Sequence, residues 1–118
     1  MKTALQLALS LCTILSANLA LADAKAWVGS YRNPDNTLEL KVRNMGPTYV
    51  QFVIVEIGKP NEMDDAWTGA VIDNEGQGIR AVVPNDLCGT VLKHQGKALV
   101  VSACSEDRVF TWVAPLAN

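Results

Sequence analysis

The chain lacks the residue spacings on which metal and redox sites depend. Its 118 residues contain one histidine and three cysteines, with neither a C-x-x-C nor an H-x-x-H pair. Cys88, His94 and Cys104 could supply only three zinc ligands, and the fourth would have to be a carboxylate, which structural zinc sites seldom use. A thioredoxin-like site needs two cysteines close together at the start of a helix, whereas Cys88 and Cys104 are far apart. We therefore expect no metal and no cofactor.

The sequence also lacks the groups of a nucleophilic active site. His94 is the sole histidine that could activate a serine or cysteine, and it adjoins the turn residues Gln95 and Gly96, where we expect it to be solvated. No serine lies in a G-x-S-x-G context. Carboxylates gather at 62–65 and 73–75, but neither stretch has the D-x-[DN]-x-[DN]-G order of a calcium loop. The protein is therefore not expected to be an enzyme.

A large excess of charge of either sign is absent as well. Ten basic and twelve acidic side chains give a net charge of −2, and the basic ones are scattered along the chain. Nucleic acids and anionic membranes are recognised by clusters of lysine and arginine. Neither is therefore expected as a partner.

An apolar segment opens the chain and has the features of an export signal. A basic start at Lys2 precedes a largely apolar run over 4–22. Small residues occur at and just after the end of this run, at Ala20, Ala22 and Ala24. This order is typical of a secretory signal peptide that is removed by cleavage. No basic stop-transfer flank follows, as a retained membrane anchor would require.

The chain thus divides into two parts. We expect a signal peptide over 1–24, cleaved after Ala22 or Ala24, and a single all-β domain over 25–118. The mature protein would then be periplasmic or secreted and would have no membrane anchor. In such compartments an even pair of cysteines is expected to form a disulfide.

Alternating hydrophobic and polar residues over most of 25–118 predict β-strands. Residues 38–42 alternate cleanly, and 48–57 is apolar on both faces, as in a central strand that is covered on both sides. Turn residues recur about every 8–12 positions, and no stretch keeps a helical period. The sequence predicts an all-β fold of about eight short strands, an antiparallel meander that forms a closed or nearly closed barrel. A β-sandwich is the alternative.

Two W-x-G sequences support a curved sheet. They occur at Trp27–Gly29 and Trp67–Gly69. A glycine inside a strand often marks a bulge or a sharp bend, with an aromatic side chain packed over the gap. Curvature of this kind favours the barrel over the sandwich.

The stretch from Cys88 to Cys104 predicts a hairpin with one disulfide at its base. A two-residue turn at Gln95-Gly96 would leave the two cysteines out of register. We therefore expect either a three-residue loop over 95–97 or a bulge at Gly89 to bring the sulfurs together. The bridge would contribute about 3 kcal/mol by chain entropy.

The loop before the second W-x-G sequence is the predicted protein-binding site. It combines carboxylates with apolar side chains, namely Glu62, Met63, Asp64, Asp65 and Trp67. Carboxylates steer a basic partner, and a buried aromatic ring anchors it. Because many enzymes that degrade bacterial cell walls are basic, we expect an exported, non-catalytic binding protein of the bacterial cell envelope. An inhibitor or immunity-type protein directed at such a basic hydrolase would fit.

A small-ligand carrier is the alternative function. Four aromatic residues, Trp27, Tyr31, Phe110 and Trp112, either pack in the core or line a ligand cavity. The core is the favoured interpretation, because a small barrel is usually filled by its own side chains. A structural component of the envelope is a third interpretation.

Overall fold

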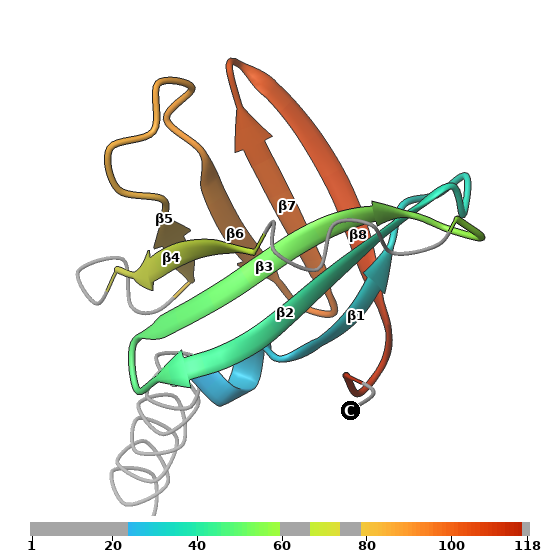
Figure 1. The fold of residues 1–118 in the computed structure, drawn as a ribbon, viewed down its shortest axis with the longest axis horizontal. Helices are drawn as coiled ribbons and strands as arrows, with labels where there is room; N and C mark the ends of the chain where they lie inside the picture. Colours follow the sequence, from blue (N-terminus) through green and yellow to red (C-terminus); the bar gives the residue numbers. More distant parts are fainter. Residues whose placement is uncertain (1–23, 60–66, 74–78, 117–118) are drawn as a thin grey trace, which may run out of the picture.

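The alternating segments form eight strands in the computed structural model, which describes residues 24–59, 67–73 and 79–116. The strands are β1 (Gly29–Arg32), β2 (Leu38–Gly46), β3 (Tyr49–Glu56), β4 (Thr68–Ile72), β5 (Arg80–Val82), β6 (Val91–Gln95), β7 (Ala98–Ala103) and β8 (Glu106–Ala114). Each strand pairs antiparallel with the next, and β8 pairs with β1, so that the sheet closes (Figure 1). The predicted barrel is confirmed, and the sandwich is not formed. No helix within the described residues is long and apolar enough to cross a bilayer.

Inward-facing side chains of every strand form the core. The alternation predicted for 38–42 is confirmed, since Leu40 and Val42 are fully buried inside the barrel. On β3, Val50 and Phe52 also point into the core. The expectation that 48–57 is covered on both faces is wrong for most of its outer face. Val53 is buried there, but its neighbours Gln51 and Val55 are partly exposed, because the outer wall of a barrel faces solvent.

The two ends of the barrel differ. A short 3-10 helix, η1 (Ala24–Trp27), precedes β1 and packs against β2 and β3 at the end where β1 begins (Figure 1). Trp27 is fully buried, and its carbonyl oxygen accepts a hydrogen bond from the Tyr31 hydroxyl at 2.8 Å. We call this the plugged end. The loops that follow β1, β3, β5 and β7 lie at the other end, which we call the open end.

Aromatic rings cover both strand glycines of the W-x-G sequences. The Trp112 ring occupies the space next to Gly29, where a side chain would meet it, and the Tyr49 ring lies in the same way over Gly69. The predicted packing of an aromatic ring over each glycine is therefore confirmed, but only Gly29 lies beside a register shift, between Ser30 and Tyr31. The covering rings come from β8 and β3 and not from the tryptophan of either sequence, because ring and glycine meet across the sheet.

The hairpin of β6 and β7 has a register that differs from the prediction. Gln95 pairs with Ala98, so the turn consists of Gly96 and Lys97. Gly96 has φ of 59° at the first turn position, as type II′ turns require. The alternatives of a Gln95-Gly96 turn and a three-residue loop are both wrong, because glycine takes the position that needs a positive φ.

The predicted disulfide Cys88–Cys104 is confirmed, with the Cα atoms 4.4 Å apart. Cys88 lies outside β6, in the loop that follows β5, and Cys104 lies in the turn between β7 and β8. The Cys104 N–H donates to the Cys88 carbonyl at 3.0 Å. The bridge thus joins two connections at the open end instead of two paired strand residues. The predicted bulge at Gly89 is wrong, because Gly89 lies in the loop before β6 and not in a strand; it adopts a positive φ of 61° there.

Candidate functional site

A cavity of about 310 Å³ opens at the open end of the barrel, and we call it the mouth cavity. Its apolar wall consists of Phe52, Ile54, Val83, Val101 and Ala103. Its polar rim consists of Thr68, Asp86, Thr90, Glu106 and Arg108. The volume lies at the lower limit of small-molecule sites in proteins. The site therefore combines an apolar interior with charged groups at its entrance.

Strand alternation explains why these side chains meet. On β8, Glu106 and Arg108 lie four and two positions before Phe110, so they are on the same face of the strand as this ring, which is buried in the core. On β7, Ala103 follows Val101 on the inner face. Toward the open end the inward residues of β7 and β8 become small or polar and no longer fill the lumen. The cavity is the part of the lumen between the core and the open end.

Asp86 holds the loop between β5 and β6 at the rim. Its Oδ2 accepts hydrogen bonds from the Thr90 hydroxyl and from the Thr90 N–H, the latter at 2.8 Å. These bonds lower the pKa of the Asp86 carboxyl, and the bond from the Thr90 hydroxyl has the largest effect. Asp86 therefore carries a negative charge and fixes Thr90 at the entrance of the cavity.

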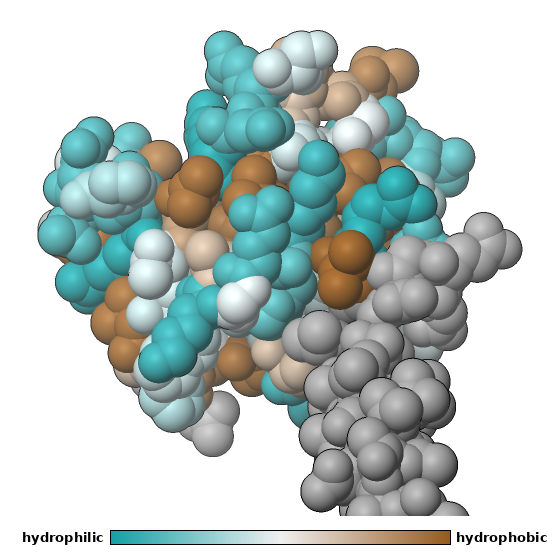
Figure 2. Space-filling view, turned by 180° about the vertical axis from the view of Figure 1, so that it is seen from behind, coloured by the Kyte–Doolittle hydropathy of each residue, from teal (hydrophilic) through white to brown (hydrophobic). Residues whose placement is uncertain are grey.

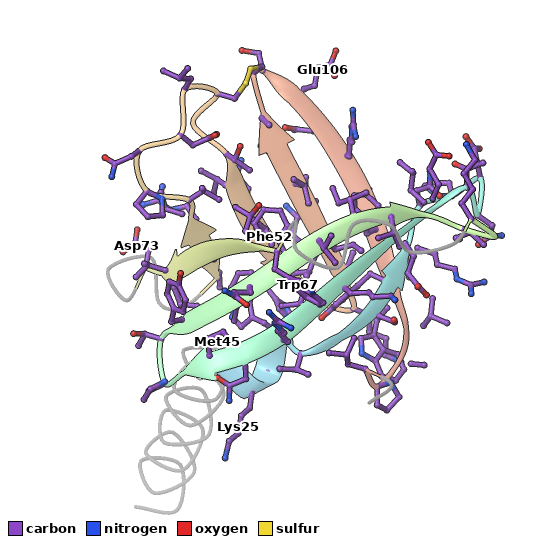
Figure 3. The ribbon with its side chains drawn as sticks, in the orientation of Figure 1. Lys25, Met45, Phe52, Trp67, Asp73 and Glu106 are labelled. Carbon is purple, nitrogen blue, oxygen red and sulfur yellow. A yellow bond between two sulfur atoms is a disulfide. The ribbon has the colours of Figure 1, made fainter. Side chains whose placement is uncertain are left out.

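Glu106 and Arg108 are the other two charged groups of the rim. They stand two positions apart on the inner side of β8, and both are exposed. Among the described residues neither forms an ion pair. Figure 3 places Glu106 next to the disulfide at the open end. A carboxylate and a guanidinium thus remain available to a polar group of a ligand.

The four aromatic residues predicted for the core or a cavity lie away from the mouth. Trp27 and Phe110 are fully buried, and Tyr31 is 2% exposed. Trp112 is 40% exposed and lines a shallow depression of about 290 Å³ near η1, together with Tyr31, His94 and Lys97. None of the four lines the mouth cavity. The alternation along β8 could have indicated part of its lining, because Arg108 and Glu106 lie on the same face of the strand as the inward-pointing Phe110.

His94 is half-buried, and the expectation of a solvated turn residue is wrong. Its ring lies edge-on to Trp27, with 5.2 Å between ring centroids, and its Nε2 is 3.3 Å from the Ala26 carbonyl oxygen. A carbonyl can only accept, so Nε2 carries the hydrogen. Burial lowers the pKa of His94, and the Ala26 contact raises it by less. His94 is partly shielded from solvent because η1, which contains Ala26 and Trp27, lies against it next to the β6–β7 turn.

Trp67 is half-buried on the outer wall. The Arg43 guanidinium lies 4.0 Å from its ring centroid, and Arg43 donates from Nε and Nη2 to Gln51 Oε1 at 2.8 and 2.6 Å. The ring is thus packed on the barrel (Figure 3). The rest of the predicted protein-binding loop, Glu62, Met63, Asp64 and Asp65, lies outside the described residues.

Charges separate between the two ends of the barrel. Six described carboxylates belong to the connections and strand ends at the open end, namely Asp35, Glu39, Glu56, Asp86, Glu106 and Asp107, against the basic Arg32, Lys59 and Arg108. The plugged end carries Lys25, Arg80 and Lys97, against the described carboxylate Asp73. The scattered charges of the sequence thus become a polarity along the barrel axis.

Exposed hydrophobic side chains on one face of the barrel are dispersed. On the face seen from behind, they occur as separate islands among hydrophilic side chains (Figure 2). Large contiguous apolar patches are the usual mark of a flat protein interface. The mouth cavity, with its apolar interior and charged rim, is the best-defined candidate site within the described residues.

Comparison of the chain with protein-family models, with curated proteins and with solved structures gives no match.

Proposed function

We propose that the protein is an exported, non-catalytic binding protein that holds a small ligand in its mouth cavity. The observation that carries this proposal is the apolar lumen above the core, which ends in a rim with Asp86, Glu106 and Arg108. Sites for small molecules typically join an apolar interior to a few polar groups that fix orientation. The carrier interpretation of the sequence is thus the one that the geometry supports best.

The cavity limits the class of ligand. A volume of about 310 Å³ accommodates a short aliphatic or single-ring group, and each buried methylene contributes about 0.8 kcal/mol. The exposed Glu106 and Arg108 suit a polar head group that remains at the entrance. We therefore propose a small amphiphile as ligand.

Export is part of the same proposal. The signal-type segment over 4–22 and the disulfide Cys88–Cys104 both favour an oxidising compartment, the periplasm or the exterior. In that setting the bridge keeps the loop that bears Asp86 next to the β7–β8 turn. The rim would then be held in shape without a ligand.

An NMR titration with hexanol, hexanoate and hexylammonium tests ligand binding and head-group preference together. We expect saturable shifts of the Val83, Val101 and Ala103 methyl signals with at least one compound, and none at Val50 in the core. Ala103→Trp, which fills the cavity, should abolish the shifts. Val109→Trp, on the exposed outer face of β8, should retain them. The absence of saturable shifts with all three compounds would contradict the proposal.

A basic protein partner at the open end is a second candidate. The excess of carboxylates there supports it, because complementary charge accelerates and orients association. The partner that fits is a basic cell-wall-directed hydrolase, with the protein acting as its inhibitor or immunity-type protein. The acidic loop with Asp64 belongs to the connection between β3 and β4, whose flanking strands end and begin at this end.

A charge-matched pair of double variants tests this candidate. Glu106→Gln with Asp107→Asn removes two negative charges from the open end, and Val109→Lys with Thr111→Lys adds two positive charges to the outer wall. Calorimetry with a basic hydrolase such as lysozyme should show weaker binding for the first variant and less change for the second. Equal effects of the two variants would show that only net charge matters. Asp64→Lys then examines the loop itself.

A further inference from the structure

The first described residue, Ala24, is an integral part of the folded barrel. Its methyl group is fully buried and belongs to the core cluster that contains Trp27 and Val42. Its backbone N–H donates to the Pro47 carbonyl oxygen in the β2–β3 turn at 3.0 Å. Ala24 also begins η1, the helix that closes the plugged end.

The two cleavage positions left open by the sequence have different consequences for this contact. Cleavage after Ala24 would remove the buried methyl group and the donor to Pro47. A polar carbonyl would lose its partner, and η1 would start at Lys25 with a charged ammonium group. Cleavage after Ala22 keeps Ala24 and its amide, with the new ammonium group placed one residue earlier, on Asp23.

We infer that processing occurs after Ala22, that the mature chain begins with Asp23, and that Ala24 is a structural residue of the plug. This inference rests on the proposed export. In the step itself a signal peptidase hydrolyses the Ala22–Asp23 peptide bond. One water molecule is consumed, which leaves a carboxylate on Ala22 and an ammonium group on Asp23. The small residues Ala20 and Ala22 then occupy the positions that the A-x-A rule requires.

Intact mass and N-terminal sequencing of the exported protein test the inference directly. The full chain is expressed in a bacterial host, and the protein is recovered from the periplasm and the medium. A mature chain that starts at Asp23 is the expected result. A start at Lys25 would overturn the inference and leave export intact. A chain that keeps residues 1–22 and stays in the cytoplasm would overturn the proposed export instead.

A stability comparison tests the structural role of Ala24 independently of the peptidase. Chains that begin at Asp23 and at Lys25 are exported behind the same foreign signal peptide, and their Tm values are measured. We expect the Lys25 chain to melt several degrees lower, because a core contact and a hydrogen bond are missing. Equal Tm values would overturn the role assigned to Ala24.

Two glycine variants separate the methyl group from the backbone. In the chain that begins at Asp23, Ala24→Gly removes the buried methyl group but keeps the N–H to Pro47. Ala26→Gly makes the same change at an exposed position of the same helix. The first variant should lower Tm more than the second. An equal decrease would show that helix propensity alone is responsible.

Discussion

Tyr31 connects the strand β1 to the plug through one buried hydrogen bond. Its hydroxyl donates to the Trp27 carbonyl at 2.8 Å, and burial raises its pKa to about 12. The phenol is therefore neutral and acts as a fixed donor over the working pH range.

Tyr31→Phe should lower the free energy of unfolding by about 1 kcal/mol, because a buried hydrogen bond is lost. Urea unfolding measures the change. Tyr49→Phe is the matched control, since its ring lies on the outer wall and is 37% exposed; its effect should stay below about 0.5 kcal/mol. Similar losses for both variants would remove the special role of Tyr31.

His94 should make stability depend on pH. The pKa of His94 in the unfolded chain is near 6.5, and burial lowers it in the folded protein. The unfolded chain therefore binds the proton more tightly. The contribution is therefore fully present above about pH 7. It decreases as the pH falls through 6.5 toward the lowered folded value.

Thermal melts between pH 8 and pH 5 examine this dependence. The wild-type Tm should fall with decreasing pH, and His94→Gln should show a shallower decrease over the same range. Carboxylate groups titrate in both proteins and cancel in the comparison. Parallel curves for the two proteins would refute the assignment.

Among the elements, the turn between β7 and β8 is the most constrained. Ala103 pairs with Glu106, and the two residues between them, Cys104 and Ser105, have φ of 51° and 66°. Type I′ turns need positive φ at both positions and favour Asn-Gly. Side chains other than glycine and asparagine rarely adopt this conformation.

Ser105→Gly should therefore stabilise the protein by about 1 kcal/mol, because glycine adopts a positive φ without steric conflict. The same substitution at Ser30, inside β1, should destabilise it by a similar amount. Chemical denaturation with the disulfide intact gives both values. A loss of stability for Ser105→Gly comparable to that for Ser30→Gly would contradict the reasoning.

The disulfide is the second device at this end of the sheet. Cys88→Ala with Cys104→Ala should lower the free energy of unfolding by about 3 kcal/mol, since the unfolded chain regains the freedom of the closed loop. Wild-type protein treated with reductant should unfold at the same denaturant concentration as the double variant. A double variant as stable as the oxidised wild type would show that the bridge contributes nothing.

The sequence predicted elements whose determinants are local. Leu40 and Val42 could be placed in the core because a period of two is a property of a single strand. The β6–β7 register was predicted wrongly, because it depends on which residue adopts positive φ. The turn at Cys104 and Ser105 contains neither glycine nor asparagine, so its sequence does not indicate a turn. The disulfide and the strand pairing of Ala103 with Glu106 hold it in place. The mouth cavity was not predicted, because it depends on which end η1 closes.

At the scale of the whole molecule, every strand pairs with two neighbours, so no part of the sheet has an independent core. The barrel should unfold in one cooperative transition. In a variant with Trp67→Phe and Trp112→Phe, tryptophan fluorescence reports on Trp27 in the plug alone, and far-UV circular dichroism reports on the strands. The two melting curves should coincide, whereas an earlier fluorescence transition would reveal a plug that opens before the sheet.

The closing pair of strands also determines how the chain could be rearranged. Ser30 lies opposite Ala114 where β1 meets β8, so β1 begins and β8 ends at the plugged end, and η1 leads from β1 to Ala24 beside the β2–β3 turn of the same end. A linker across the plugged end could join Leu116 to Ala24, and new termini could be introduced between the exposed Pro34 and Asp35, which gives a circular permutant with all eight strand pairs. A domain fused after β8 would sit at the opposite end from the mouth. Such a fusion would leave the entrance unobstructed, as would immobilisation at the same position.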